Sequence, residues 1–460
     1  MNALSFGGLS GLLVASLAPI SVYAATRMEK QLTFAPKHHD LDNNDNFSPD
    51  DRWLVFDTRD EQTAISGNAV IGRVFLESGK EAELYREPHA RPWGPGVGAA
   101  SVNPRDGSVV FIRGLPSATQ QRPYGMWRRG GACLPAKEPG DLVQLDARDV
   151  IAPFTPGALR GGTHRHEWSA DGQWIGFTYN DALLAEIEER TGERVNLRTV
   201  GVATRIGGPV SVPSGRENQN GELFSAVVVR VVPNPRPGSD EISKAFEDAW
   251  VGTNGYRKPD GAWQKRARAF LGTVRTADGR EVTEVFVVDI PDKINVASAG
   301  EPLEGTPTTM PGPPRGCIQR RLTYTEERQF PGVALEPRHW VRSSPDGAQI
   351  VFLAKDDSGV VQGWFVNSAN GVVVQVTHHA RSVQSCVRWS SDGSQLLYVG
   401  EGSLMICDAR TGTEAFGKAR ALTGPSATPP ENPVWSHDGR VIAFNRRVEG
   451  WKQIFTVGTD

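Results

Sequence analysis

The chain has 460 residues, of which 50 are glycine, 32 are proline and 38% are hydrophobic. This composition supplies apolar material for a large core with many turns, and it excludes a chain that is disordered overall. The 50 basic and 53 acidic side chains leave a formal charge of −3, which excludes recognition of nucleic acid or of an acidic membrane through overall charge.

The first 26 residues contain no charged side chain and include the small residues Ala24 and Ala25 near their end. This pattern predicts a signal peptide over residues 1–25 and therefore a periplasmic or secreted protein, with no membrane span left after cleavage. The alternative is that translation starts at Met28, in which case the protein stays in the cytoplasm.

A hairpin pattern recurs six times in the rest of the chain. Each copy has a turn of the Ser-x-Asp-Gly type followed by a strand of β-branched and aromatic residues; Asp caps the turn and Gly supplies a positive φ. The copies begin at Ser48, Asn103, Ser169, Ser344, Ser390 and Ser436. The last three lie 46 residues apart, close to the period of about 40–45 residues of a four-stranded propeller blade.

A seventh set of strands is predicted between Ser169 and Ser344, at residues 225–230, 269–274 and 285–290. The chain is therefore expected to be all-β, with a single seven-bladed β-propeller domain over residues 28–460.

A recurring Leu-Thr or Val-Thr pair predicts how the ring closes. The pair ends the outer strand of several blades and appears again at Leu32-Thr33, whereas the last blade has no outer strand of its own. We expect the N-terminal strand at residues 31–33 to pair with the last blade, which removes an open sheet edge.

Two helical insertions are predicted, near residues 181–196 and 237–256. The second is predicted from the helical i, i+3, i+4 spacing of its apolar residues, which are Ile242, Ala245, Phe246, Ala249 and Trp250. Together with a long loop over residues 113–131, the insertions are expected to form a cleft on the face where the channel opens, here called the top.

Four segments carry a family resemblance. They are Leu159 to His166, Phe177 to Asp181, Pro237 to Ile242 and Pro337 to Trp340. On these segments the chain resembles the YidR-type family of bacterial β-propellers, and its turns resemble TolB-type and WD-like repeats. YidR-type proteins are distantly similar to oligogalacturonate lyases, which are seven-bladed propellers in which three His and one Gln hold a metal.

Three histidines stand at related positions before their turns. His164 and His339 lie five residues before the turn and His166 lies three residues before it, so the alternation of a strand places them on one face. Neutral imidazoles are common ligands of Zn, Mn and Fe, and the three residues therefore predict a divalent metal site in the channel. The resemblance adds Gln384 as a fourth ligand. The alternative is that these histidines bond to backbone and water around a solvated channel.

Arginines and further histidines surround these positions. Arg160, Arg338 and Arg342 suit bidentate binding of a substrate carboxylate, and they equally suit ion pairs between blades. The resemblance to uronate lyases implies His378 or His379 as the base that removes the proton next to that carboxylate.

Two functions follow from the sequence. The first is a secreted TolB-like propeller that binds a protein partner or a glycan at its top-face channel mouth, without catalysis. The second is a metal-dependent lyase or hydrolase that acts on an acidic oligosaccharide. Neither a G-x-S-x-G motif nor a phosphate-binding loop occurs, and the first function is favoured because no decisive catalytic signature is present.

Overall fold

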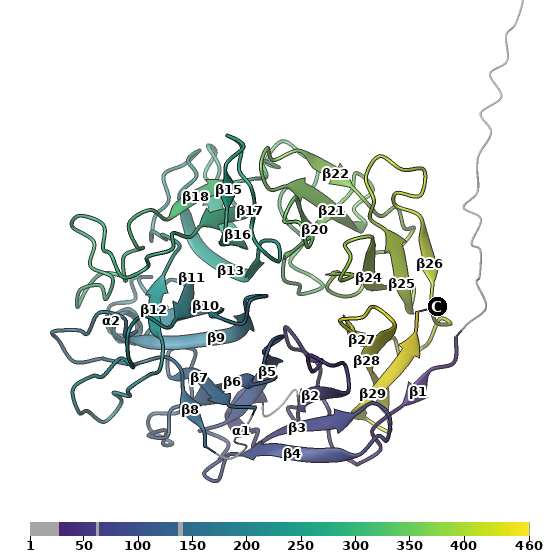
Figure 1. Cartoon of the computed structure of the whole chain (residues 1–460). Coiled ribbons are helices and arrows are strands. Elements are labelled where there is room, and N and C mark those ends of the chain that lie inside the picture. Colours follow the sequence, from purple (N-terminus) through teal and green to yellow (C-terminus); the bar gives the residue numbers. More distant parts are fainter. Residues whose placement is uncertain (1–26, 61–63, 137–140, 460) are drawn as a thin grey trace, which may run out of the picture.

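The computed structural model describes residues 27–60, 64–136 and 141–459. In this part of the chain seven antiparallel sheets stand in a ring around a central axis, as Figure 1 shows. The protein is a seven-bladed β-propeller, which confirms the predicted fold class. The predicted signal peptide lies outside the described residues.

The blades follow the order of the chain, and their strands run from the channel outward. Blade 1 has β2 (Trp53–Asp57), β3 (Val70–Phe75) and β4 (Glu81–Arg86); blade 2 has β5 (Val97–Val102), β6 (Val109–Gly114), β7 (Arg129–Leu134) and β8 (Val143–Gln144). Blade 3 has β9 (Gly161–Trp168), β10 (Trp174–Asp181), β11 (Thr199–Thr204) and β12 (Phe224–Val227); blade 4 has β13 (Ile242–Trp250), β16 (Ala267–Arg275), β17 (Glu281–Asp289) and β18 (Ile318–Arg321). Blade 5 has β19 (Arg342–Ser343), β20 (Gln349–Lys355), β21 (Val361–Asn367) and β22 (Val373–Gln375); blade 6 has β23 (Arg388–Trp389), β24 (Gln395–Gly400), β25 (Ser403–Asp408) and β26 (Ala419–Ala421). Blade 7 has β27 (Glu431–Trp435), β28 (Val441–Val448), β29 (Trp451–Gly458) and β1 (Lys30–Gln31). A small hairpin, β14 (Tyr256–Arg257) and β15 (Trp263–Gln264), and two helices, α1 (Ala64–Gly67) and α2 (Ala182–Thr191), complete the described elements.

The ring closes where the two ends of the described chain meet. Strand β1 pairs antiparallel with β29, and Figure 1 shows it beside the C-terminus. The pairing continues through Leu32, whose N–H donates to the carbonyl of Ile454 at 2.8 Å, and through Thr33, whose hydroxyl donates to Gln453 Oε1 at 2.7 Å. The predicted closure by the N-terminal strand is confirmed.

The recurring threonine follows the outer strand in four blades and bonds to the neighbouring strand there. In four blades its hydroxyl oxygen accepts a hydrogen bond from a backbone N–H of the neighbouring strand. The donors and distances are Ile454 to Thr33 (2.9 Å), Val285 to Thr323 (2.8 Å), Gly363 to Thr377 (2.8 Å) and Leu404 to Thr423 (3.0 Å). The side chain therefore satisfies a buried donor where the ladder ends, which explains why the same residue type recurs.

The Ser-x-Asp-Gly turns have a common hydrogen-bond pattern. In the turn at Ser390, the Ser hydroxyl donates to Asp392 at 2.6 Å and accepts from the N–H of Gln395 at 3.0 Å, and Gly393 has a φ of +72°. The first copy has Asp51 at the glycine position with a φ of +55°, and its carboxylate accepts bonds from blade 7. The first turn therefore also helps to hold blade 1 against blade 7, where the ring closes.

The second helical insertion was wrongly predicted. Residues 242–250 form strand β13, the innermost strand of blade 4. A bulge at Glu247 interrupts the alternation of this strand, and both faces are buried: Ile242 and Ala245 pack toward blade 3, while Phe246 packs toward blade 5. Because both faces are buried and the bulge shifts the register by one residue, the apolar residues of this strand recur at helical spacing. Helix α2 lies within the other predicted insertion, 181–196, and begins at an Asp181 cap.

The blade boundaries between Ser169 and Ser344 also differ from the prediction. The segment at residues 225–230 begins within β12, the outer strand of blade 3, so it does not belong to blade 4. The apolar core consists of layers between neighbouring blades. None of the helices among the described residues is long and apolar enough to cross a membrane.

Candidate functional site at the channel mouth

Bulges recur at one height of the inner strands. Ala99, Arg165, Glu247 and Asn432 have φ values of +54°, +56°, +50° and +51°, and the strand register shifts next to each of them. A positive φ is costly for residues other than glycine, and bulges commonly re-aim side chains next to functional sites. Three of the four residues are polar, so the bulges deliver Arg, Glu and Asn side chains to the channel mouth.

The bulge at Arg165 separates the histidines that were expected to share a face. His164 pairs with Thr178 before the bulge, whereas Glu167 pairs with Gly176 after it, so period-two alternation does not hold between His164 and His166. His166 is fully buried, and its Nε2 lies 2.9 Å from the Thr163 hydroxyl. His164 is half-buried and lies among arginines; burial and then Arg129 and Arg198 lower its pKa well below the usual value.

The other two predicted metal ligands use their polar atoms elsewhere. His339 Nε2 accepts a bond from the N–H of Leu353 at 3.2 Å, and its Nδ1 lies 3.1 Å from the carbonyl of Pro337. Gln384 Oε1 accepts from the N–H of Gly402 at 2.8 Å. Within the described ranges, His, Cys, Asp and Glu side chains form no group of three that fits a metal ion. The predicted quartet therefore does not fit a shared Mn, Zn or Fe ion in this arrangement.

A segment of blade 1, residues 40–46, reaches toward the inner strands of other blades. It takes the place of an inner strand, with isolated bridges to blade 1 at Asp40 and nearby Phe47 and a bond from the N–H of Val55 to the carbonyl of Asn46 at 2.8 Å. Arginines from three other blades bind it. They are Arg165 to Asp42 at 2.7 Å, Arg342 to Asn44 at 2.9 Å, and Arg388 to the carbonyls of Asn43 and Asn44 at 2.8 and 2.7 Å. We call this segment the channel plug, because its side chains and backbone tie blades 1, 3, 5 and 6 together across the axis.

The three predicted substrate arginines have different roles. Arg160 is fully buried, paired with Asp181 and bonded to the carbonyls of Thr306 and Thr309. Arg342 pairs with Glu167 and binds the channel plug. Only Arg338, whose side chain is 51% exposed, remains open to a ligand among the three. The interpretation as ion pairs between blades therefore holds for Arg342 and for Arg338, which pairs with Glu247 of blade 4, and Arg160 is a structural residue.

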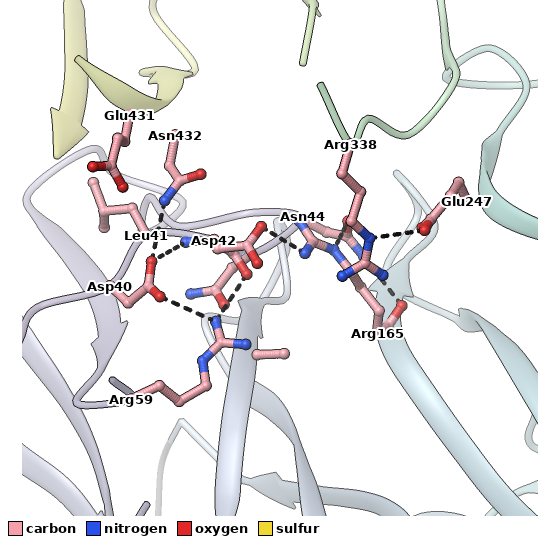
Figure 2. Close-up of polar contacts among 12 residues, drawn as sticks. Asp40, Leu41, Asp42, Asn44, Arg59, Arg165, Glu247, Arg338, Glu431 and Asn432 are labelled. Carbon is pink, nitrogen blue, oxygen red and sulfur yellow. Dashed lines mark hydrogen bonds and ion pairs between the residues drawn. The ribbon is translucent and has the colours of Figure 1, made fainter. Parts of the chain in front are cut away.

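Five polar side chains lie together at the mouth, and one of them, Asp42, comes from the channel plug. We call Asp42, Arg165, Glu247, Arg338 and Asn432 the mouth ring. Figure 2 shows them between blades 1, 3, 4, 5 and 7. Arg338 Nε donates to Glu247 at 2.9 Å, and Asn432 donates to Asp40 at 3.1 Å. Although burial alone would raise the pKa of Asp42, Arg165 and Arg59 lower it, so this carboxylate is ionised.

The residues predicted as catalytic bases lie outside the mouth ring. His378 is exposed, and His379 Nε2 lies 2.7 Å from the Tyr398 hydroxyl. Both are in the connection between β22 and β23, and burial lowers the pKa of His379. Neither histidine makes a described contact with the mouth ring.

Sequence reasoning missed most of the mouth ring. Asn44, Arg165 and Asn432 each stand four residues before a turn serine, and this shared offset marks the positions that reach the channel. An alignment of the hairpin copies at that offset, instead of at the histidines, identifies them.

Comparisons with known proteins support the fold and the kinship of the chain. A family model described as "Protein of unknown function (DUF3748)" matches residues 96–219. The Escherichia coli (strain K12) protein YidR is 37% identical over 428 residues, which cover 92% of this chain and 96% of that protein. A structure of oligogalacturonate lyase in complex with manganese covers 95% of both chains, with 12% identity and a TM-score of 0.52. A putative TolB from Agrobacterium tumefaciens covers 83% of this chain and 94% of its own, with 14% identity and a TM-score of 0.36. At 12% identity the lyase structure indicates a fold and no function.

Proposed function

We propose that this chain, which belongs to the YidR family of β-propellers, is a binding protein that takes a glycan at the mouth of its central channel. The observation that carries the proposal is the mouth ring. Arg165, Glu247 and Asn432 reach the ring through strained bulges, and strain of this kind is concentrated at functional sites.

The channel plug supports binding at the mouth instead of passage through the channel. Arg165, Arg342 and Arg388 hold the plug from three blades, and Arg388 binds its backbone. A ligand therefore meets a rigid polar floor. Preorganised floors favour binding, because few side chains must be ordered when the ligand arrives.

The chemistry of the mouth ring favours a glycan over a protein partner. Its members are Asp, Arg, Glu, Arg and Asn, which offer planar donors and acceptors suited to hydroxyl groups. The core of a protein interface is instead enriched in aromatic residues, Met and Arg and depleted in Asp and Glu, so the carboxylates Asp42 and Glu247 are what set the mouth ring apart. The nearby Trp340 is buried beneath Arg165 and Arg338, with their guanidinium carbons 3.4 and 4.6 Å from its ring centroid.

A glycan array followed by calorimetry on the full chain tests the proposal. The variant Glu247→Gln keeps the shape of the ring but removes the carboxylate, and we expect an affinity at least about tenfold lower for the glycans that bind. Glu83→Gln on the exposed part of β4 is the matched control and leaves the affinity unchanged. Equal affinities for all three proteins, or no glycan bound by the folded wild type, reject the proposal.

Lyase activity on an acidic oligosaccharide is the second candidate, and one observation favours it. His164, an imidazole that is neutral at pH 7, lies at the mouth among arginines that suit a substrate carboxylate. Incubation with oligogalacturonate, with and without added Mn²⁺, and measurement of ultraviolet absorbance from an unsaturated product tests this candidate. No product under either condition rejects it.

We place the protein in the periplasm or outside the cell, where polymeric glycans are met. The apolar, uncharged residues 1–25 support this location. Fractionation of cells that express the full chain, with mass spectrometry of the mature N-terminus, tests it: a mature chain that begins at Met28 in the cytoplasm rejects it.

A further inference from the structure

Four cationic side chains gather at the channel mouth, on the side of blades 2 to 5, and one of them, Arg338, also belongs to the mouth ring. They come from separate elements. Arg129 begins β7, Arg198 precedes β11, Lys244 lies in β13, and Arg338 precedes β19. We call these four residues the inner cluster.

Backbone pairing brings the elements of the inner cluster together. The N–H of Ala245, next to Lys244, donates to the carbonyl of Arg198 at 2.9 Å. Arg198 also donates to Asn180, whose backbone pairs with Gly162 in the strand that carries His164. The fold therefore places Arg198, Lys244 and His164 together. Arg338 contacts the same Trp340 ring as Arg165, the neighbour of His164, and burial and then charges that include those of Arg129 and Arg338 lower the pKa of His164.

The inner cluster lacks matching carboxylates. In the described part of the chain, one member, Arg338, has an ion-pair partner, Glu247. Arg129 is 6% exposed, donates to the neutral Tyr124 hydroxyl at 2.9 Å and leaves its Nε without a partner among the described residues. Arg198 has the neutral acceptors Asn180 Oδ1 at 3.3 Å and Met126 Sδ at 3.8 Å. The four cations thus have one direct ion-pair partner among the described residues, Glu247.

The electrostatic environment agrees with this geometry. Burial, followed by the charge of Arg129, lowers the pKa of Arg198 to about 10. Burial, followed by the charge of Arg198, also lowers the pKa of Lys244. Like charges held together in partly buried positions destabilise one another, and a bound anion relieves the repulsion while it gains charge-assisted hydrogen bonds.

We infer that the inner cluster binds an oxyanion, a carboxylate or a sulfate ester, carried by the ligand at the channel mouth. The inference deepens the proposed function and rests on it for the glycan that carries the anion. The anion-binding property itself belongs to the cluster and has its own measurement with small probes. Arg338 joins the two features, because it belongs to the mouth ring and to the inner cluster.

Thermal unfolding of the full chain with small anions tests the inference. The probes are galacturonate, its methyl ester and inorganic sulfate, each at the same ionic strength as a chloride reference. We expect galacturonate or sulfate to raise Tm and the neutral methyl ester to leave it unchanged, because binding to the folded state alone stabilises it. A larger shift with galacturonate identifies a carboxylate ligand, and a larger shift with sulfate identifies a sulfate ester.

Variants tie the effect to the inner cluster. Lys244→Gln and Arg198→Gln each remove a charge-assisted bond and are expected to weaken anion binding by about ten- to a hundredfold. Arg194→Gln is the matched control, because this exposed arginine lies near the cluster and pairs with Glu281, 3.8 Å away. We expect it to bind anions as the wild type does.

The outcomes separate this inference from the proposed function. A Tm shift that is equal for the ester and the acid, absent for every anion, or unchanged in both cluster variants overturns the inference. If glycans bind at the mouth and respond to Glu247→Gln while the anion shifts are absent, the proposed function stands and the inference fails. If the anion shifts appear but no glycan binds, the inner cluster is an anion site and the glycan proposal fails.

Discussion

Two groups of arginines both have members in the long blade 2 loop, residues 113–131, and they differ in how carboxylates pair with them. In the outer cluster, guanidinium nitrogens of Arg122, Arg128 and Arg148 lie 3.0, 3.1 and 3.1 Å from the carboxylate of Glu217. In the inner cluster the nearby carboxylate, Glu247, forms an ion pair with Arg338 and none with Arg129, Arg198 or Lys244 among the described residues. Arg128 and Arg129 are adjacent in the chain but join opposite clusters. A buried arginine with a paired carboxylate in the fold is therefore structural, and an arginine without one is free to bind a ligand.

The largest expected effect comes from removing the carboxylate of the outer cluster. Glu217 is 7% exposed, and Glu217→Gln leaves two buried guanidiniums without a counter-ion. We expect the free energy of unfolding to fall by about 3–5 kcal/mol, the usual effect of removing one partner of a buried ion pair. Urea denaturation measures the change.

Glu186→Gln is the control for this measurement. Glu186 is 61% exposed and lies 3.4 Å from Arg122, so its loss is expected to change stability by no more than about 0.5 kcal/mol. If Glu217→Gln is as stable as this control, solvent already screens the charges of the outer cluster. The outer and inner clusters then do not differ in the way proposed.

The fold was predictable from the sequence because its determinants are local. Each turn depends on a Ser, an Asp and a Gly within a few residues, as in the turn at Ser390. Ring closure was predictable for the same reason, since Leu32-Thr33 repeats a short pattern whose hydrogen bond is identical in other blades. Local rules failed at β13, where the bulge at Glu247 gave strand residues a helical period.

The site was harder to predict because its contacts join distant parts of the chain. The bond between Arg342 and Asn44 spans 298 residues, and no spacing rule relates the two. The bulge at Arg165 also broke the alternation on which the histidine prediction rested. Of the predicted substrate residues, Arg338 lies in the mouth ring, and its roles as a ligand contact and a member of the inner cluster stay predictions.

A pair of variants, one in each cluster, tests whether stability and binding separate. Arg148 donates to Glu217 and to the carbonyls of Trp127 and Gly161, so Arg148→Gln is expected to lower the free energy of unfolding by about 3 kcal/mol. The anion-induced Tm shift is expected to persist in this variant and to disappear in Arg198→Gln, which keeps its stability. Loss of the shift in both variants means that the clusters act as one unit.

Acid pH is expected to affect the inner cluster through His164. The pKa of His164 is lower in the folded protein than the usual value of 6.5, so the unfolded chain binds more protons between the two values. Stability is therefore lost as the pH falls below about 6.5. A bound oxyanion stabilises the imidazolium, and we expect galacturonate to reduce this loss.

His339 is the internal control for the acid effect. Burial lowers its pKa to about 4, which corresponds to a loss of about 2 kcal/mol at pH 5 relative to pH 7. His339 bonds to backbone atoms and not to the inner cluster, so galacturonate is expected to leave unchanged the loss of stability that comes from protonation of His339. Unfolding curves of His164→Gln and His339→Gln from pH 7 to pH 5 separate the contributions of the two histidines to the loss of stability in acid. An equal galacturonate effect in both variants contradicts the assignment of the anion site.

The smallest expected effect on stability comes from giving the inner cluster a carboxylate of its own. Met126 is 47% exposed and its sulfur lies 3.8 Å from Arg198, so Met126→Glu places a negative charge where the outer cluster has Glu217. We expect the free energy of unfolding to rise by about 0.5–1 kcal/mol, as for a partly exposed ion pair, and the anion-induced Tm shift to vanish. Met126→Gln, which has a similar shape and no charge, is expected to keep the shift. If Met126→Glu still responds to galacturonate as the wild type does, an internal carboxylate is not what distinguishes a structural arginine cluster from a binding one in this propeller.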